Sequence, residues 1–177
     1  MSEAIDVRLR AAEAVDLPAI TALYADHVRA GTASFELDPP DEAEMTRRWN
    51  DVVARGLPYQ VAVRGDQTVG YAYAGPYRPR PAYRFTVEDS VYIRPDCAGQ
   101  GVGRMLLDAL IAACERGDAR QMIAVIGDSA NTPSIRLHAA AGFTHTGLLS
   151  SVGWKVGRWL DVVLMQRALG PGNTGPV

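Results

Sequence analysis

Apolar residues along the chain repeat with two periods, and the period changes at glycines, prolines and capping residues. In four segments they recur every three or four positions, which is typical of an amphipathic helix. Each of these segments follows an aspartate, a proline or a glycine-rich turn that favours a helix start. We expect the helices to begin at Asp16, Asp41, Met105 and Pro133 and to end near Gly31, Gly56, Ile111 and Ala141.

Seven other segments alternate apolar and polar residues or form short apolar runs, and both patterns are typical of β-strands. Turn residues such as Arg64-Gly65-Asp66 separate them. The predicted strands cover residues 6–11, 59–64, 68–74, 83–93, 121–127, 143–153 and 158–167. With the helices they give the order β-α-α-β-β-β-α-β-α-β-β, which predicts an α/β protein.

Length and composition favour one domain with a full hydrophobic core. The chain has 177 residues, of which 47% are apolar. We place the domain at residues 1–168. The tail, residues 169–177, is rich in glycine and proline and can bury nothing, so we expect it to be disordered.

Charge, cysteine content and the first residues exclude several classes of protein. A formal net charge of −2 gives no attraction to nucleic acid or to an anionic membrane. The N-terminus lacks the regions of a signal peptide, and no apolar stretch is long enough to span a membrane, so we expect a cytoplasmic protein. Cys97 and Cys114 are too few for a disulfide scaffold, and the three histidines lack metal-ligand spacing, so no bound metal is expected.

A glycine-rich turn joins the strand that ends at Ile93 to the next helix. Gly99, Gly101 and Gly103 let the backbone turn tightly, and the free N–H groups of the first helical turn favour an anion. Glycines at alternate positions weaken a helix start, which argues for a task here, although an ordinary glycine-rich loop is the alternative. The spacing fits neither a Walker phosphate loop nor the dinucleotide fingerprint. The segment predicts a pyrophosphate cradle of another kind.

The loop Ala98-Gly99-Gln100-Gly101-Val102-Gly103 resembles the acetyl-CoA signature of the GNAT superfamily of N-acetyltransferases, Gln/Arg-x-x-Gly-x-Gly/Ala, with Ala98 where glutamine or arginine is usual. The order of predicted elements is also similar to the GNAT fold. The resemblance therefore implies a central mixed, mostly antiparallel, twisted sheet flanked by about four helices. It further implies that acetyl-CoA binds, without a metal, at Val91, Tyr92, Ile93, Gly99, Gln100, Gly101, Val102, Gly103, Arg104, Asn131 and Ser134.

Five separate segments resemble, more narrowly, the phosphinothricin N-acetyltransferases and their methionine sulfoximine-acetylating relatives. They are Phe35, 72–76, 82–88, 124–127 and 133–138. The resemblance implies a homodimer with substrate pockets near the subunit contact. Residues 77–84 also hold three arginines in a proline-stiffened loop, which suits capture of a carboxylate or phosphinate, with a solvated basic turn as the alternative. The predicted substrate-binding residues are Phe35, Arg78, Arg80, Tyr83 and Thr86.

Glu88 is the candidate general base. Alternation along its strand places Glu88 on the polar face with Thr86 and Ser90, and Asp89 on the opposite face. A carboxylate there can accept the proton of an amine, and partial burial would move its pKa toward the working pH. The residues alone leave a solvent-facing glutamate as the alternative, whereas the resemblance implies that Glu88 is the base. Asp89 is the second choice.

His138 is the candidate acid. Asn131, Ser134 and His138 fall at positions i, i+3 and i+7 of one predicted helix and so share a stripe. A hydrogen-bonded structural histidine is the alternative. The wider superfamily commonly has a tyrosine at this position, and the resemblance implies that His138 protonates or contacts the CoA thiolate. It also implies that Asn131 contacts the pantetheine arm.

These features predict an enzyme that transfers the acetyl group of acetyl-CoA directly to the α-amine of a small anionic amino acid or analogue, such as phosphinothricin, methionine sulfoximine or methionine sulfone. Neither cysteine stands in an obvious arrangement with a base, so an acetyl-cysteine intermediate is not expected. The alternatives are an acetyltransferase of protein N-termini or polyamines, and a non-catalytic acetyl-CoA-binding sensor. Retention of Glu88 and His138 argues against the sensor.

Overall fold

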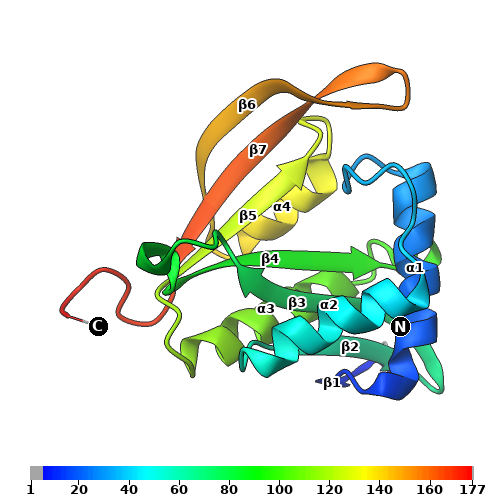
Figure 1. Cartoon of the computed structure of the whole chain (residues 1–177), viewed down its shortest axis with the longest axis horizontal. Helices are drawn as coiled ribbons and strands as arrows, with labels where there is room; N and C mark the ends of the chain where they lie inside the picture. The colour runs from blue at the N-terminus through cyan, green and yellow to red at the C-terminus, as the bar shows by residue number, and fades with distance from the viewer. Residues whose placement is uncertain (1–5, 177) are drawn as a thin grey trace, which may run out of the picture.

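A central mixed sheet organises the protein (Figure 1). The computed structural model describes residues 6–176; residues 1–5 and 177, which the predicted domain and tail include, lie outside that range. Across the described residues the sheet has seven strands in the order β1-β2-β3-β4-β5-β7-β6. The strands are β1 (Arg8–Ala11), β2 (Tyr59–Arg64), β3 (Gln67–Pro76), β4 (Thr86–Ile93), β5 (Gln121–Gly127), β6 (Thr144–Lys155) and β7 (Arg158–Ala168).

Helices pack on both faces of this sheet. They are α1 (Leu17–Ala30), α2 (Glu42–Ala54), α3 (Val102–Glu115) and α4 (Thr132–Ala140). Neighbouring strands are antiparallel except β4 and β5, which are parallel. The predicted fold class, a mostly antiparallel mixed sheet with helices around it, is confirmed.

Local chemistry sets several element boundaries. The Asp41 carboxylate accepts the Glu44 N–H at 2.8 Å and so caps α2. The predicted strand from residue 83 begins only at Thr86, because Pro81–Tyr83 forms a short 3₁₀ turn with proline at its start. Leu169, the first residue of the predicted tail, is fully buried, and its N–H donates to the Arg120 carbonyl at 3.0 Å. The expectation that the tail buries nothing is therefore wrong at this residue, because its apolar side chain packs against the core.

Two hydrophobic cores lie on opposite faces of the sheet. One is formed by α1 and α2 against β2 and β3, and the other by α3 against the central strands. Figure 1 shows α1 and α2 in front of these strands and α3 behind them. The largest fully buried side chains in these cores include Ile20, Val28, Val61, Tyr71, Leu106, Leu107, Leu110 and Met122. Fixing β3 and β4 between two packed layers gives the edge of β4 a rigid support.

The sheet opens between β4 and β5. These strands pair only from Thr86–Glu88 on β4 to Gln121–Ile123 on β5, although β3 follows β4 as far as Ile93 and β7 follows β5 as far as Gly127. Beyond Glu88, therefore, the two strands diverge, as their arrows do in Figure 1. Backbone groups along both facing edges are left for another partner.

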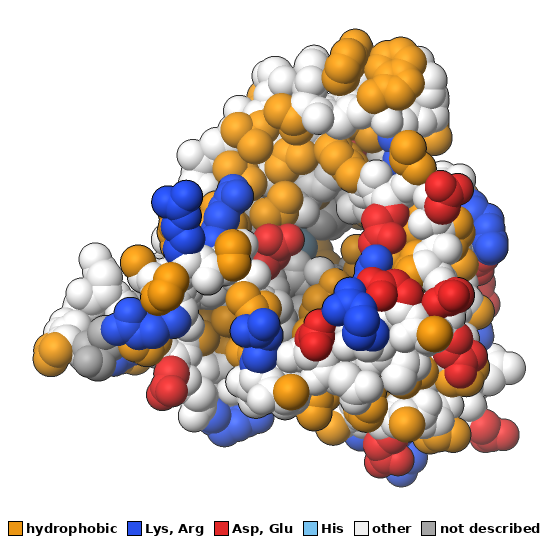
Figure 2. All heavy atoms as spheres, viewed as in Figure 1, with side chains coloured by type: hydrophobic (Ala, Val, Ile, Leu, Met, Phe, Trp, Pro, Cys, Tyr) orange, Lys and Arg blue, Asp and Glu red, His pale blue; other side chains and the backbone are white. Residues whose placement is uncertain are grey.

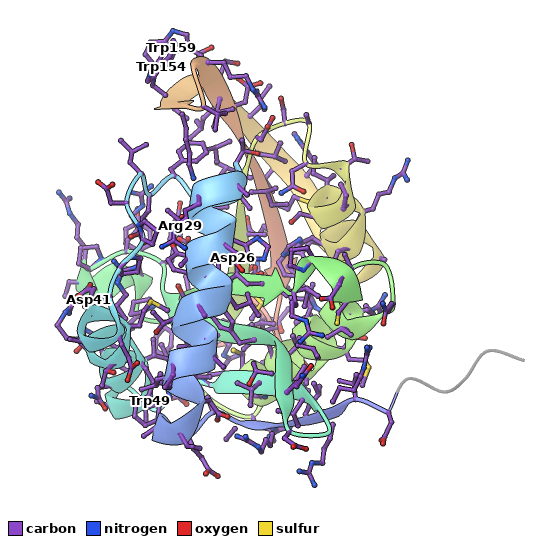
Figure 3. The ribbon with its side chains drawn as sticks, turned by 90° about the vertical axis from the view of Figure 1, so that its right-hand side faces the viewer. Asp26, Arg29, Asp41, Trp49, Trp154 and Trp159 are labelled. Carbon is purple, nitrogen blue, oxygen red and sulfur yellow. The ribbon has the colours of Figure 1, made fainter. Side chains whose placement is uncertain are left out.

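The hairpin of β6 and β7 projects beyond the rest of the sheet, and Figure 3 shows Trp154 and Trp159 at its tip. Its two-residue turn, Val156-Gly157, has positive φ at both positions, 49° and 74°. Several large apolar side chains here are exposed: Leu148, Leu149, Val152, Trp154, Val156 and Trp159. In the described part of the chain, no helix has the length and apolar character needed to cross a membrane.

Candidate active site

A cavity of about 320 Å³ occupies the opening between β4 and β5. Figure 2 shows the hollow in the centre of this face, with the apolar surface of the hairpin above it and charged side chains around it. It is lined by residues 33–35, Tyr73, 88–92, 124–127, Ser134, His138 and Val162. Both predicted catalytic residues, Glu88 and His138, are therefore brought to one cavity, together with Phe35.

The glycine loop forms an open cradle at the start of α3. Gly99 and Gly101 have φ of 74° and 84°, and a Cβ at either position would meet no atom within 4 Å. Gly101 is the residue before the helix, and no side chain of residues 6–176 caps it. The first N–H groups of α3 are thus free of a side-chain acceptor, which fits the pyrophosphate of acetyl-CoA.

The side chains of this loop are bonded within the protein. Gln100 accepts a hydrogen bond from Arg64 at 2.7 Å and donates one to the Asp96 carbonyl at 2.8 Å. Arg104 donates to Asp108 at 2.6 Å and to the Ala140 carbonyl at 2.9 Å. The backbone, rather than these side chains, is the part of the loop that is available to a ligand.

The other predicted cofactor residues lie along the edges of the opening. Val91, Tyr92 and Ser134 line the cavity. The Ile93 carbonyl accepts a hydrogen bond from His27 Nε2 at 2.8 Å, so this group is already in use. Asn131 caps α4, because its side-chain oxygen accepts the Ser134 N–H at 3.3 Å.

Glu88 is the cavity residue whose protonation is most suited to base chemistry. Its side chain lies at the last paired position of β4, where the sheet opens. Burial raises the pKa of the Glu88 carboxyl above its ordinary value, the adjacent Asp89 charge raises it further, and the Arg78 guanidinium opposes both. A raised carboxyl pKa makes Glu88 a better proton acceptor near neutral pH.

Asp89 and His138 form a buried ion pair that no local pattern indicated. Asp89 lies on the face opposite Glu88, as predicted, and its Oδ2 is 2.9 Å from His138 Nε2. The other ring nitrogen, Nδ1, donates to the Ser134 carbonyl at 2.8 Å. Because both nitrogens are bonded inside the protein, the role of His138 as a proton donor stays a prediction, and it requires this pair to open.

Phe35 is wedged between the ends of β5 and β6. A Cβ at Gly127 would lie 2.9 Å from Phe35 Cε1, and one at Gly153 would overlap the same ring. The residues on either side of Phe35 in the sequence, Ser34 and Glu36, are held by hydrogen bonds from α1, α2 and β6. Tyr24 Oη lies 2.8 Å from Ser34 Oγ and donates to Glu36 at 2.7 Å.

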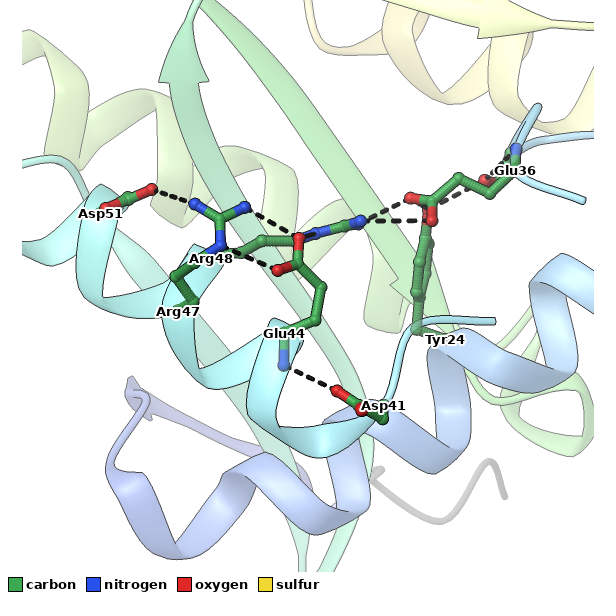
Figure 4. Close-up of polar contacts among 8 residues, drawn as sticks. Tyr24, Glu36, Asp41, Glu44, Arg47, Arg48 and Asp51 are labelled. Atoms are coloured by element: carbon green, nitrogen blue, oxygen red, sulfur yellow. Dashed lines mark hydrogen bonds and ion pairs between the residues drawn. The ribbon is translucent and has the colours of Figure 1, made fainter. Parts of the chain in front are cut away.

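The remaining contacts to this loop come from α2 and from the hairpin. Arg48 donates to Glu36 at 2.6 Å and to Glu44 at 2.7 Å, as Figure 4 shows. Lys155, which is only 6% exposed, donates from β6 to the Ser34 carbonyl at 2.6 Å. The wall of the cavity at Phe35 is therefore fixed by side chains that do not line it.

The arginine loop lines a neighbouring cavity of about 390 Å³ at the start of β4. Four of the predicted substrate residues line it: Arg78, Arg80, Tyr83 and Thr86. Two further arginines, Arg55 and Arg84, line it as well. Among residues 6–176, no ion pair involves any of its four arginines. Of the predicted substrate residues only Phe35 lines the first cavity, while Arg78 is near enough to Glu88 to lower its pKa.

The described residues contain no group of three His, Cys, Asp or Glu side chains that could share a metal ion.

Comparison with known proteins shows the family of this chain. The model of the Acetyltransferase (GNAT) family matches residues 20–143. A phosphinothricin N-acetyltransferase of Alcaligenes faecalis is 64% identical over 159 residues, which are 90% of this chain and 81% of that protein. An L-methionine sulfoximine/L-methionine sulfone acetyltransferase of Pseudomonas paraeruginosa is 42% identical over 95% of this chain and 98% of its own.

A solved structure has the same fold and contains the cofactor. The phosphinothricin acetyltransferase of Sinorhizobium meliloti, in complex with AcCoA, superposes with a TM-score of 0.93 at 47% sequence identity, covering 97% of this chain and 93% of that one. The family match extends over most of the chain, and the relatives are similar over nearly its full length. The chain therefore belongs to the GNAT family and is an acetyl-CoA-dependent N-acetyltransferase.

Proposed function

We propose that this enzyme acetylates the α-amine of a small anionic amino acid or analogue, with phosphinothricin, methionine sulfoximine and methionine sulfone as first substrates. The observation that carries the proposal is the cavity between β4 and β5, which joins Glu88 to the wall formed by Phe35. Its volume of about 320 Å³ suits an amino acid and the end of a cofactor, and is small for a folded protein terminus. The names of the relatives support the same substrate class.

Acetyl-CoA binds along the opening in this proposal, and it supplies an acetyl group activated as a thioester. The N–H groups at the start of α3 hold its pyrophosphate, with Gly99 and Gly101 giving the backbone close access. The unpaired edge of β4 beyond Glu88 offers hydrogen bonds to the amide groups of the pantetheine arm. Val91 and Tyr92 line that path.

Glu88 removes a proton from the substrate ammonium, directly or through water, so that the amine can attack in a ternary complex. Its raised pKa suits this role at neutral pH. Both cysteines are buried and neither lines the cavity, which argues for direct transfer to the amine. The arginine loop supplies the charge that captures the substrate carboxylate, with Arg80 contributing a bidentate hydrogen bond.

The enzyme acts as a homodimer in this proposal, and the β6–β7 hairpin forms the contact. β6 is a 12-residue edge strand whose neighbouring surface carries the two tryptophans of Figure 3. A second copy would cover Trp154 and Trp159 and would lie next to Lys155, which contacts the loop of Phe35. Sedimentation should give a dimer for the parent and a monomer when both tryptophans are replaced by serine.

A thiol-release assay tests the substrate class. Acetyl-CoA is supplied with phosphinothricin, methionine sulfoximine, methionine sulfone, common amino acids, spermidine and a short peptide. We expect the highest kcat/KM for the sulfoximine, sulfone or phosphinate compounds and little activity with spermidine. If the peptide or spermidine is the best substrate, the alternative of a protein N-terminal or polyamine acetyltransferase replaces this proposal.

A further inference from the structure

The ladder between β4 and β5 ends at Glu88, and the next residue turns to a different partner. Asp89 reaches α4 and forms its ion pair with His138, which is 49 positions away in sequence. The two side chains are only 2% and 5% exposed. The pair therefore joins β4 to α4 at the point where the strands separate, and both residues line the cavity.

Hydrogen bonding defines the state of this pair. The Ser134 carbonyl can only accept, so His138 Nδ1 carries a proton, and Nε2 faces the Asp89 carboxylate. Burial lowers the pKa of the His138 imidazole, but the hydrogen bond and charge of Asp89 outweigh it and leave the pKa above its ordinary value. The contact at 2.9 Å and the raised pKa of His138 both favour an imidazolium that donates from Nε2 to Asp89. Within residues 6–176, the second Asp89 oxygen, Oδ1, is buried without a hydrogen-bond partner, so His138 is what compensates this charge.

We propose that Asp89 is a positioning residue: its ion pair with His138 holds β4 to α4 where the ladder ends, and thereby sets the width of the acetyl-CoA cleft and the place of Glu88 on its wall. The inference rests on the proposed acetyl transfer for its kinetic consequences. Its geometric part, the support of the cleft, does not depend on which amine is the substrate. In this role His138 is the hydrogen-bonding partner that holds the Asp89 side chain in place.

The pair also controls the electrostatic field at Glu88. Asp89 on its own strand and Arg78 of the arginine loop act on the pKa of Glu88. Glu88 in turn raises the pKa of Tyr73 of β3, and His138 of α4 lines the same cavity. Cys114 of α3 lies close enough to Asp89 for that charge to act on its thiol, whose pKa burial raises to about 12, so this thiol stays neutral. A carboxylate at Asp89 and an imidazolium at His138 carry opposite charges, so their effects on the pKa of Glu88 should have opposite signs. Removing either one alone should move the pKa of Glu88, and in opposite directions.

Three variants test this arrangement through the pH profile of kcat/KM. Asp89→Asn removes a negative charge, so the acid limb of the profile should move down by about half a pH unit. His138→Gln leaves Asp89 without its counter-ion, so the limb should move up by a similar amount. The double variant keeps a neutral hydrogen-bonding pair, and its limb should lie between those of the single variants. Limbs that do not move, or that move in the same direction in both single variants, would overturn the proposal.

Acetyl-CoA binding gives a readout that needs no turnover. Calorimetry should show affinity reduced about tenfold in each single variant and partly restored in the double variant. Asp16→Asn is the control, because it breaks another ion pair of a buried aspartate, with the partly exposed Arg10 at 2.6 Å, away from the cavity. It should lower the melting temperature but leave acetyl-CoA affinity and the acid limb unchanged.

The two proposals fail in different ways. If the parent acetylates none of the amines tested, while the single variants still bind acetyl-CoA more weakly than Asp16→Asn does, the substrate class is wrong and the cleft support stands. If the parent is active but the single variants bind acetyl-CoA as the parent does, the positioning role is refuted. A thioester whose leaving group needs no proton gives a further test of His138. If the loss of kcat in His138→Gln disappears with that thioester, His138 acts as an acid, and the positioning role is refuted.

Discussion

Replacing Glu88 by glutamine should reduce activity and raise stability at the same time. The amide keeps the shape of the side chain but cannot accept a proton from the substrate. General base catalysis contributes about two to four orders of magnitude, so we expect kcat to fall at least a hundredfold, about 2.7 kcal/mol of transition-state stabilisation. The acid limb of the rate profile should vanish, while acetyl-CoA affinity, measured by calorimetry, should stay close to that of the parent.

The stability change follows from the direction of the pKa shift. The pKa of Glu88 is higher in the folded chain than in the unfolded chain, because the carboxyl is buried beside Asp89. Folding therefore becomes less favourable as the pH rises through the interval between the two values. The Glu88→Gln variant should melt near the parent at pH 4 and above it at pH 7. Glu42→Gln, at an exposed position of α2 outside the cavity lining, is the control for the kinetics and should leave the rate profile unchanged. An unchanged rate in Glu88→Gln would refute the assignment and point to Asp89 or a water relay.

Three further changes test other parts of the structure. Gly101→Val forces a β-branched residue to φ of 84° and should weaken acetyl-CoA binding in calorimetry, whereas Gly56→Val, at φ of 69° in open space, should lower only the melting temperature. Arg80→Ala should raise KM for amino-acid substrates by the equivalent of about 1–3 kcal/mol of binding free energy, but should not raise it for amines that lack a carboxylate. Equal changes in KM for both kinds of substrate would show that Arg80 does not bind the carboxylate. Val156→Asn relieves the positive φ of a β-branched residue in a two-residue turn and should stabilise the fold by roughly 1 kcal/mol in denaturant titration.

Features set by local chemistry were predictable from the sequence. The cap at Asp41 and the strand Tyr59–Arg64 were found where the patterns placed them. The alternation in β4 placed Asp89 opposite Glu88, and the structure confirms this. The strand was predicted to begin at Tyr83, three residues too early, because Tyr83, Arg84 and Phe85 continue the alternation of β4, whereas Tyr83 ends the short turn that Pro81 begins.

The contacts that hold the candidate site together depend on tertiary structure. Asp89 and His138 are 49 positions apart, and Lys155 is 121 positions from Ser34, whose carbonyl it contacts. Neither spacing leaves a pattern in one sequence, since the partners meet only after the sheet and α4 are assembled. The sequence shows only that Lys155 stands next to a hairpin turn. Most lysines at such positions are solvated, so nothing indicated that this one is buried.

The two glycines that flank Phe35 make its ring the main determinant of pocket volume on that side. Neither Gly127 nor Gly153 has a side chain that could move into space left by a shorter residue at position 35, so the space would stay continuous with the cavity. Enlarging the substrate range would then need one change, Phe35→Ala. Refilling part of the enlarged pocket would need a second substitution, Gly153→Ala. The parent cannot accept this alanine, because the Phe35 ring already occupies the place of its Cβ. These positions offer stepwise adjustment of pocket size without altering Glu88 or the ion pair beside it.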